Sequence, residues 1–350
     1  PKVVAPEHGM DFLDHFELRD VGRRIDGLET PVPLIDVGKA LANLERWQQH
    51  CDRTGRAGRS HIKTHKLVGM AKAQLALGAG GIAVQKLGEA EVMADAGIAA
   101  MMMTFNVVGA SKLTRLSALM RRIDITVVAD NEAMTEGLAH AAAGAGRSLS
   151  VLVECDTGGR RNGAQSPQAA QALARRIDAT TGLVFAGLLT HGGFGGRLAA
   201  KAFLDEARGL LKADGIEVPL VSAGGSPEMW SEQGLEGIDE YRVGTYVYYD
   251  RSQVKRDVCS FDDCALTVLS TVVSAPTAER AIIDAGSKAL TSDLIGLDGY
   301  GIVQDLGHAK VYEVNEEHGY LDTAGLDRKP RVGDRIRVTP NHACPVSNLF

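Results

Sequence analysis

The feature that most constrains the fold is a repeated alternation between two kinds of segment over residues 31–250. Short apolar runs alternate with segments whose apolar residues recur at helical spacing, as Leu41, Leu44 and Trp47 do. Strands that alternate with helices form a parallel sheet, because each helix returns the chain to the same end of the sheet. The expected strands are residues 31–37, 61–66, 81–85, 101–106, 123–130, 149–156, 184–191, 220–226 and 241–249.

Eight or nine such strands predict a (β/α)8 TIM-like barrel, for which about 250 residues are usual. A doubly wound sheet is the alternative that the same alternation allows. After residue 255 the helical periodicity is lost, and Thr- and Val-rich runs at residues 265–275, 281–285, 309–314 and 335–338 indicate a β domain. The predicted domains are the barrel over residues 28–252 and a β domain made of residues 1–27 and 253–350.

Composition excludes several classes of partner. A formal net charge of −6 argues against a nucleic-acid-binding or anionic-membrane-binding protein, since both need a basic face. No apolar run reaches the roughly 18 residues of a membrane span. Five cysteines are few, odd in number and widely spaced, which favours a reducing, cytoplasmic compartment over a disulfide scaffold. Cys259 and Cys264 belong to no partner motif.

Polar side chains end most of the expected strands. In a TIM-like barrel the chemistry lies at the carboxyl ends of the strands, where the loops converge. Loop residues are often polar by chance, but a reactive group at nearly every strand end is harder to dismiss. The residues in question are Lys63, His65, Gln85, Asn106, Asp130, Glu154, Asp156, Arg161, His191, Ser226, Thr245 and Tyr246.

A lysine and two glycine-containing segments suggest one cofactor. In His61-Ile-Lys-Thr-His-Lys66, strand geometry would place His61, Lys63 and His65 on one face, unless the segment is an exposed cluster. Ser222-Ala-Gly-Gly-Ser226 and Arg242-Val-Gly-Thr-Tyr246 lie late in the barrel, where phosphate is often bound, although neither is a P-loop. Together they suggest a phosphorylated aldehyde that forms a Schiff base with the lysine.

A possible metal site lies near the carboxyl end, in Asn341-His-Ala-Cys-Pro345. His342 and Cys344 can place both donor atoms on one zinc or similar divalent ion. Two protein ligands leave coordination positions open, as a catalytic metal requires, although a pair this short also occurs by chance. Glu316, Glu317 and His318 could supply a third ligand or a base, or could form a solvated turn.

Seven segments in a fixed order carry a resemblance to a known family. The chain resembles the D-threonine aldolase and D-serine dehydratase family of fold-type III pyridoxal-phosphate enzymes, over residue 28 to the last residue. The block at residues 284–293 and the ending Cys-Pro-Val-Ser-Asn-Leu-Phe look most like the D-threonine aldolase branch. The segments are His61-Ile-Lys-Thr-His-Lys66, Val84-Gln-Lys-Leu-Gly-Glu-Ala90, Glu154-Cys-Asp-Thr-Gly158 with Arg161 and Gly163, Arg242-Val-Gly-Thr-Tyr246, Ile283-Asp-Ala-Gly-Ser-Lys288, Glu316-Glu-His-Gly319 and Asn341-His-Ala-Cys-Pro-Val346.

The resemblance implies a role for each candidate residue. Lys63 would carry pyridoxal 5'-phosphate and act in catalysis with His191, and His342 and Cys344 would bind a divalent metal (Mn, Mg or Zn). The substrate would be a small D-3-hydroxy-amino acid, and the protein a homodimer in which the β domain of one subunit helps to complete the other's site. The remaining cofactor-binding residues would be Gln85 and Arg161 near the phenolic oxygen, Gly225, Ser226, Gly244 and Thr245 at the phosphate, and Asn106 and Tyr246.

Two departures from the family pattern bear on the reaction. His191 stands where many of the aldolases have tyrosine, and its Thr-His pair is similar to the D-threo-3-hydroxyaspartate dehydratase branch. Gly159-Arg-Arg-Asn162 replaces the commoner Gly-Arg-Cys. We expect an aldolase, in which a base such as His191 or a metal-bound water takes the hydroxyl proton and the Cα–Cβ bond breaks. The alternatives are a dehydratase, in which Lys63 takes the Cα proton, and a pyridoxal-phosphate-binding protein without turnover.

Overall fold

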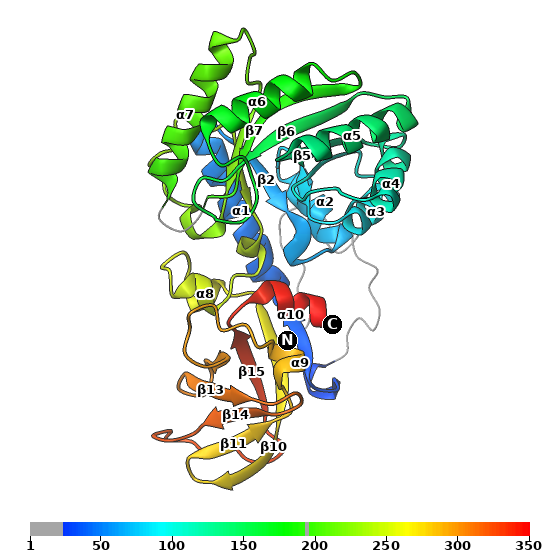
Figure 1. Ribbon diagram of the computed structural model, residues 1–350. Coiled ribbons are helices and arrows are strands. Elements are labelled where there is room, and N and C mark those ends of the chain that lie inside the picture. The colour runs from blue at the N-terminus through cyan, green and yellow to red at the C-terminus, as the bar shows by residue number, and fades with distance from the viewer. Residues whose placement is uncertain (1–23, 193–195) are drawn as a thin grey trace. The chain divides into compact units, whose positions relative to one another are not determined.

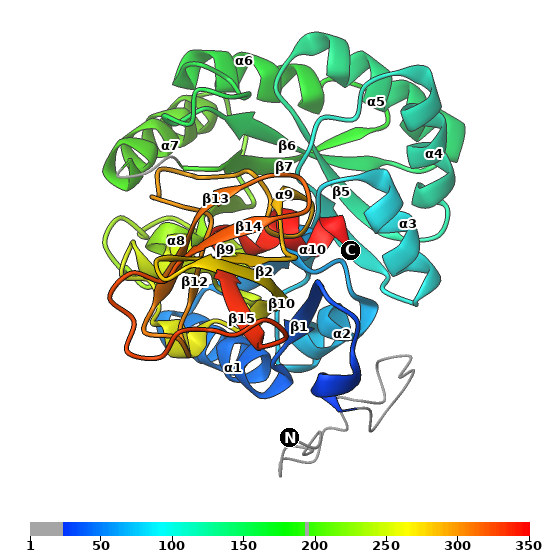
Figure 2. The ribbon, with the colours of Figure 1, turned by 90° about the horizontal axis from the view of Figure 1, so that it is seen from below.

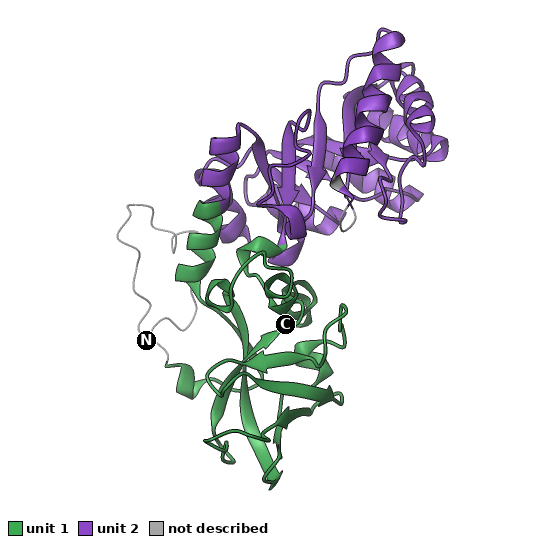
Figure 3. Ribbon diagram, turned by 90° about the vertical axis from the view of Figure 1, so that its left-hand side faces the viewer, with its two compact units in different colours: residues 1–46, 245–350 green, residues 47–244 purple. Residues whose placement is uncertain are grey.

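The computed structural model describes residues 24–192 and 196–350, which form two compact units. Unit 2 spans residues 47–244, and unit 1 combines the described residues before 47 with residues 245–350 (Figure 3). These bounds differ from the expected division at residues 28 and 252. The helix α1 (Val37–Thr54) contains the boundary, and the chain enters unit 1 directly after the last barrel strand.

Unit 2 is a closed barrel of eight parallel strands, which confirms the predicted fold (Figures 1 and 2). Its strands are β2 (Ala57–His61), β3 (Ile82–Val84), β4 (Ala100–Met103), β5 (Asp124–Ala129), β6 (Leu149–Cys155), β7 (Leu183–Thr190), β8 (Val221–Gly224) and β9 (Glu240–Val243). The helices between them are α2 (Val68–Ala76), α3 (Leu87–Asp95), α4 (Ala110–Met120), α5 (Glu132–Ala145), α6 (Pro167–Asp178) and α7 (Arg197–Ala213).

Local sequence explains where these helices begin and which face they bury. The Ser166 side chain accepts a hydrogen bond from the Ala169 amide, and Pro167 occupies the first turn of α6. Leu173 and Ile177, one helical turn apart, are buried in the same helix. Asn131 caps α5 in the same way as Ser166 caps α6.

The first expected strand, residues 31–37, is not part of the barrel. Its core forms β1 (Val32–Ile35), which pairs antiparallel with β10 (Leu266–Thr277) in unit 1. The reason is that β2 pairs with β9 and closes the barrel, so no edge remains for a ninth strand. Of the eight or nine barrel strands expected from the sequence, the structure therefore has eight.

Unit 1 contains a seven-stranded antiparallel sheet in the order β1-β10-β11-β14-β13-β12-β15. The four β runs expected after residue 255 are confirmed as β10, β11 (Arg280–Ile283), β13 (Ala309–Val314) and β15 (Arg335–Pro340). The short strands β12 (Gly301–Val303) and β14 (Gly319–Asp322) begin with glycine, which gives a weak strand signal. The short helices are α8 (Arg251–Val254), α9 (Ser287–Leu290) and α10 (Ala343–Leu349), and no helix in the described part of the chain is both long and apolar enough to cross a membrane.

An apolar layer inside the barrel supports the residues that follow it. Met102, Val128, Leu152 and Leu189, from β4 to β7, form one buried cluster. Since side chains alternate along a strand, the residue two positions further on points to the same side. Glu154 holds this position within β6, and Thr104, Asp130 and His191 directly follow β4, β5 and β7, so polar residues come next along the chain after the apolar cluster.

Candidate active site and metal-binding pair

Lys63 lies in a single 3-10 turn rather than on a strand. Strand β2 ends at His61, and the turn η3 (Ile62–Thr64) begins there because the His61 side chain accepts a hydrogen bond from the Lys63 amide at 3.4 Å. The prediction that His61, Lys63 and His65 share one face of a strand was wrong for this reason. Lys63 is half-buried, whereas the neighbouring Lys66 is exposed and pairs with Glu89.

The two histidines beside Lys63 have different surroundings. His61 is buried, and its Nε2 lies 3.0 Å from Gln85 Oε1 and 2.9 Å from Thr104 Oγ1. Burial, Lys63 and Arg242 lower the pKa of His61 well below its ordinary value, so the ring is neutral. His65 is also buried, accepts a hydrogen bond from the Leu67 amide and therefore shapes the loop.

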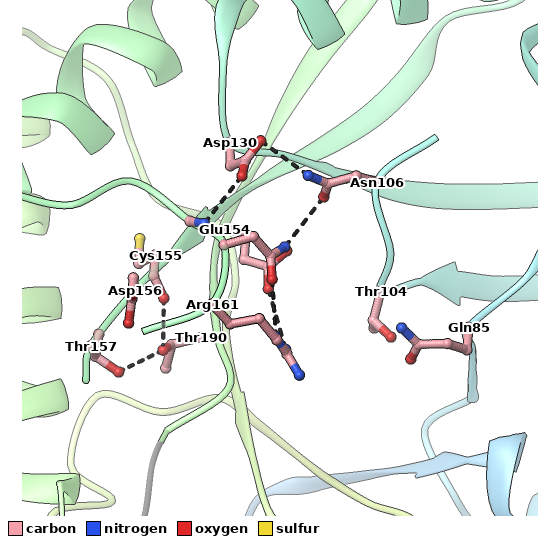
Figure 4. Close-up of polar contacts among 12 residues, drawn as sticks. Gln85, Thr104, Asn106, Asp130, Glu154, Cys155, Asp156, Thr157, Arg161 and Thr190 are labelled. Atoms are coloured by element: carbon pink, nitrogen blue, oxygen red, sulfur yellow. Dashed lines mark hydrogen bonds and ion pairs between the residues drawn. The ribbon is translucent and has the colours of Figure 1, made fainter. Parts of the chain in front are cut away.

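A hydrogen-bonded network joins the ends of β4, β5 and β6 (Figure 4). Asn106 donates to Asp130 at 3.1 Å, and Asn162 donates both to Glu154 at 2.7 Å and to Asn106 at 3.4 Å. The Arg161 guanidinium lies 3.7 Å from the buried Glu154 carboxylate. The structure thus brings together Asn106 and Arg161, which the sequence placed at one cofactor, through Glu154 and Asn162.

Glu154 is a buried carboxyl group with an unusual charge state. Burial raises the pKa of Glu154 to about 7, while Arg161 and Arg242 act in the opposite direction. The group is therefore partly protonated near neutral pH. A carboxyl group whose pKa is raised by burial and lowered by two nearby cations is a candidate functional-site residue.

His191 directly follows β7 and is exposed. Partial desolvation and the positive charges of Arg242, Arg161 and Lys63 lower the pKa of His191 below its ordinary value. The ring is therefore neutral and free to accept a proton. The charges of Lys63 and Arg161 act on His191, so these three residues predicted from the sequence lie near one another in unit 2.

Arg242 is a functional candidate that the strand-end argument missed, because it lies inside β9 rather than after it. Its guanidinium is buried, donates to the main-chain oxygen of Thr190 at 2.7 Å and also contacts Ser222. Burial lowers the pKa of Arg242 to about 10, so the group stays charged. An arginine at an inward strand position of an otherwise apolar run was the signal that could have found it.

Two glycine-containing segments end β8 and β9 in unit 2. Gly225 has φ of +150°, which side chains rarely adopt, and a Cβ there would lie in ordinary contact with the Gly192 carbonyl and Pro227 at 3.9 Å, so the backbone conformation rather than lack of space favours glycine. Ser226 follows as the buried first residue of η4 (Ser226–Glu228). A Cβ at Gly244 would lie 3.0 Å from Thr64 and 3.1 Å from the His61 carbonyl, which explains why glycine is needed there.

Thr245 and Tyr246, expected at the same strand end as Gly244, are in unit 1 instead. They begin the 3-10 turn η5 (Thr245–Val247), in which Tyr246 is fully buried. Thr245 Oγ1 lies 3.5 Å from Cys344 Sγ.

His342 and Cys344 come together in unit 1. His342 is the N-cap of α10, and its side chain forms a hydrogen bond with that of Cys344. Its Nδ1 lies 2.7 Å from Asp293 Oδ2, and the Ala343 amide between the two candidate ligands donates to Asp250 at 2.9 Å. Burial disfavours the charged imidazole, but Cys344 and Asp293 together raise the pKa of His342 to about 9. Asp293 is a second residue that sequence reasoning missed.

The suggested third ligands do not join this pair. Glu316 and Glu317 pair with Lys288 at 3.0 and 2.6 Å, and His318 is exposed. Among the residues that the structure describes, three or more His, Cys, Asp or Glu side chains nowhere converge on one point. The candidate ligands in unit 1 are therefore limited to the pair His342 and Cys344, with Asp293 on the Nδ1 side of the histidine.

A cavity of about 140 Å³ lies beside Gln85 and Asn106. Its lining includes three cationic side chains, Lys86, Lys112 and Arg115, and apolar groups such as Phe105. The Lys86 ammonium lies 3.5 Å from the centre of the Phe105 ring. The Arg115 guanidinium is paired with Glu91 at 2.6 Å, so the cavity is mainly apolar, with Lys86 and Lys112 at its edge.

Comparison with known proteins agrees with this architecture. The family model for the alanine racemase N-terminal domain matches residues 35–252, and that for a putative serine dehydratase domain matches residues 265–350. The fold and the candidate residues thus define a protein with an alanine-racemase-type barrel. The chain belongs to the family of D-threonine aldolases and D-3-hydroxyaspartate dehydratases.

Two relatives and one solved structure represent that family. D-threo-3-hydroxyaspartate dehydratase of Delftia sp. (strain HT23) is 33% identical, covering 92% of this chain and 93% of its own. D-threonine aldolase of an Arthrobacter species is 31% identical, covering 92% and 87%. A solved structure of D-threo-3-hydroxyaspartate dehydratase, with a cysteine replaced by alanine and described as metal-free, has a TM-score of 0.85 at 32% identity and covers 93% of both chains. The relatives are lyases of two kinds.

Proposed function

We propose that the protein is a pyridoxal-phosphate- and divalent-metal-dependent lyase that cleaves D-3-hydroxy-amino acids, in the manner of D-threonine aldolase, to glycine and an aldehyde. The observation that carries the proposal is the contact between His342 and Cys344, with Asp293 on the far nitrogen of the histidine. A protein that only carries the cofactor has no need of such a pair.

The residues of unit 2 fit the cofactor. Lys63 supplies the amine, and the main chain at Gly225, which has no side chain, together with the buried Ser226 that begins the next turn, suits a phosphate group. Gly244 would border the phosphate at the next strand end, and Gln85, Asn106 and Arg161 would contact the ring substituents. Bound there, the cofactor supplies an electron sink for the carbanion that forms at Cα. The roles expected for Thr245 and Tyr246 stay predictions.

The residues of unit 1 fit a metal. Because His342 Nδ1 is engaged with Asp293, Nε2 is the nitrogen left for the ion, and Cys344 supplies a thiolate. A nitrogen and a sulfur donor favour zinc over the harder magnesium or manganese. Bound there, the metal lowers the pKa of a coordinated hydroxyl group.

The proton transfers fall to residues of this chain. Neutral His191 can accept the β-hydroxyl proton, and that transfer leads to cleavage between Cα and Cβ. If Lys63 instead accepts the Cα proton, the β-hydroxyl group leaves as water and the products are an oxo acid and ammonia. The dehydratase is therefore the second candidate, and the similarity to the Delftia dehydratase favours it.

Product analysis decides between the two reactions. The purified protein, reconstituted with pyridoxal phosphate, would be incubated with D-threonine and with D-threo-3-hydroxyaspartate, with and without a chelator. The anionic substrate is included because the Delftia relative is a D-threo-3-hydroxyaspartate dehydratase. Glycine with acetaldehyde or glyoxylate, lost on chelation, supports the aldolase. An oxo acid with ammonia supports the dehydratase instead.

A pair of lysine variants tests whether turnover depends on Lys63. Lys63→Ala should abolish turnover, whereas Lys66→Ala, which removes an exposed lysine three residues away, should not. A protein that binds the cofactor but releases none of these products would contradict the proposal and leave the non-catalytic alternative. Light scattering tests the expected homodimer separately.

A further inference from the structure

Cys259 and Cys264 flank a short turn in unit 1, and both are free thiols. Cys264 is only 3% exposed, whereas Cys259 is partly exposed. The Cys264 thiol forms a hydrogen bond with the Cys259 side chain and also lies 3.7 Å from the main-chain oxygen of Ser260. One residue of the pair is thus partly exposed, and the other is buried next to it.

The backbone between the two cysteines is held at several points. Ser260 and Asp263 form a reciprocal capping box around η6 (Phe261–Asp263). The Asp263 carbonyl accepts from Asn43 at 2.9 Å, and the Asp263 carboxylate pairs with Arg46 at 3.1 Å. Fixing the turn in this way keeps the thiols adjacent, which raises the effective concentration of one thiol at the other.

We propose that Cys259 and Cys264 form a reversible dithiol–disulfide site that reacts with small-molecule disulfides such as glutathione disulfide. The Cys259 thiolate attacks the reagent, one glutathione leaves, and a mixed disulfide forms. The Cys264 thiolate then attacks Cys259 Sγ, the mixed S–S bond breaks, and the second glutathione leaves. Two protein thiols lose two protons and two electrons, and the reagent gains them as two thiols. The site does not depend on the proposed lyase activity.

Two other cysteines of the chain provide an internal comparison. Cys51 and Cys155 are buried in unit 2, and burial raises the pKa of each thiol to about 12. Thiols of this kind react slowly, because the thiolate is the nucleophile. The hydrogen bond with Cys259 and burial raise the pKa of the Cys264 thiol as well, so what distinguishes this pair is the partly exposed Cys259, which makes the first attack. We therefore expect oxidation at residues 259 and 264 rather than at residues 51 and 155.

The test uses peptide mapping of the full-length protein. Reduced protein is equilibrated with glutathione disulfide and glutathione at a series of ratios, quenched in acid, unfolded, alkylated and digested with trypsin. Both cysteines fall in one tryptic peptide, residues 257–280, and the other three cysteines fall in separate peptides. We expect this peptide to change from two alkyl labels to none, with a mass two hydrogens below the unlabelled dithiol, and dithiothreitol to restore both labels.

Cys259→Ser replaces the more exposed thiol and should leave Cys264 with its single label at every ratio. Two labels on the wild-type peptide at all ratios would overturn the proposal. A glutathione adduct on Cys259 that persists while Cys264 remains labelled would also overturn it, since the second exchange step would then not occur. Equal oxidation of Cys51 or Cys155 would contradict the selectivity argument.

Discussion

Replacing Glu154 by glutamine should change how the stability of the barrel depends on pH. Burial holds the pKa of Glu154 at about 7, against an ordinary value of 4.5. Between these two values the folded state keeps a proton that the unfolded state releases, so stability falls as pH rises through the window. The difference, 7 minus 4.5, or about 2.5, corresponds to about 3 kcal/mol at most.

Glutamine has nearly the same shape and stays neutral, and its oxygen can still accept from Asn162. Relative to the wild type, Glu154→Gln should therefore gain up to about 3 kcal/mol in the free energy of unfolding between pH 5 and pH 8. Urea unfolding of the cofactor-free protein, followed by tryptophan fluorescence, measures this. Both tryptophans, Trp47 and Trp230, lie in unit 2, so the signal reports on the barrel rather than on unit 1.

The matched control is Glu91→Gln on α3. The Arg115 guanidinium lowers the pKa of Glu91, so its contribution to stability is present above the ordinary value and is lost only at more acidic pH. This variant should follow the wild-type profile between pH 5 and pH 8. If Glu154→Gln also runs parallel to the wild type over that range, the argument from burial is refuted.

Three further outcomes follow from the candidate site. Lys63→Ala should lose the visible absorption band of lysine-bound pyridoxal phosphate, whereas Lys66→Ala should keep it; an unchanged spectrum of Lys63→Ala would exclude this lysine as the attachment point. His342→Ala should keep that band but bind less metal on elemental analysis, with His318→Ala as the control. Asp293→Asn should weaken metal affinity about 10- to 100-fold by titration with zinc, as loss of an outer hydrogen-bond partner does elsewhere, and unaltered affinity would contradict its orienting role.

The barrel could be predicted because its signal repeats. Each strand and each helix gives only a weak pattern, but the pattern repeats along the chain over eight strands, and few folds are compatible with that repetition. The strand over residues 31–37 was assigned to the wrong sheet for the same reason. Its apolar pattern is that of any short strand, and only the pairing of β2 with β9 shows that the barrel is already closed.

Candidate residues were predictable where they end strands, and contacts between distant segments were not. Glu154 and His191 could be predicted because each is a polar residue at the end of an apolar run, and that pattern is visible in the local sequence. Asp293 lies 49 residues from His342, and nothing in the local sequence of either residue indicates the 2.7 Å contact between them. The pairing of Cys259 with Cys264 was missed because it depends on the side-chain geometry of a 3-10 turn.

The electrostatics of unit 2 link substrate charge to base strength. Burial lowers the pKa of His191 most, and Arg242, Arg161 and Lys63 lower it further, so in the free protein this histidine is neutral but a weak base. An anionic ligand that approaches the same cations offsets their field and raises the pKa of His191 toward neutrality, where a general base acts best. A substrate with a second carboxylate offsets more of that field than D-threonine does. The histidine that distinguishes this chain from many aldolases should therefore work best on an acidic hydroxy-amino acid, whichever bond the enzyme breaks.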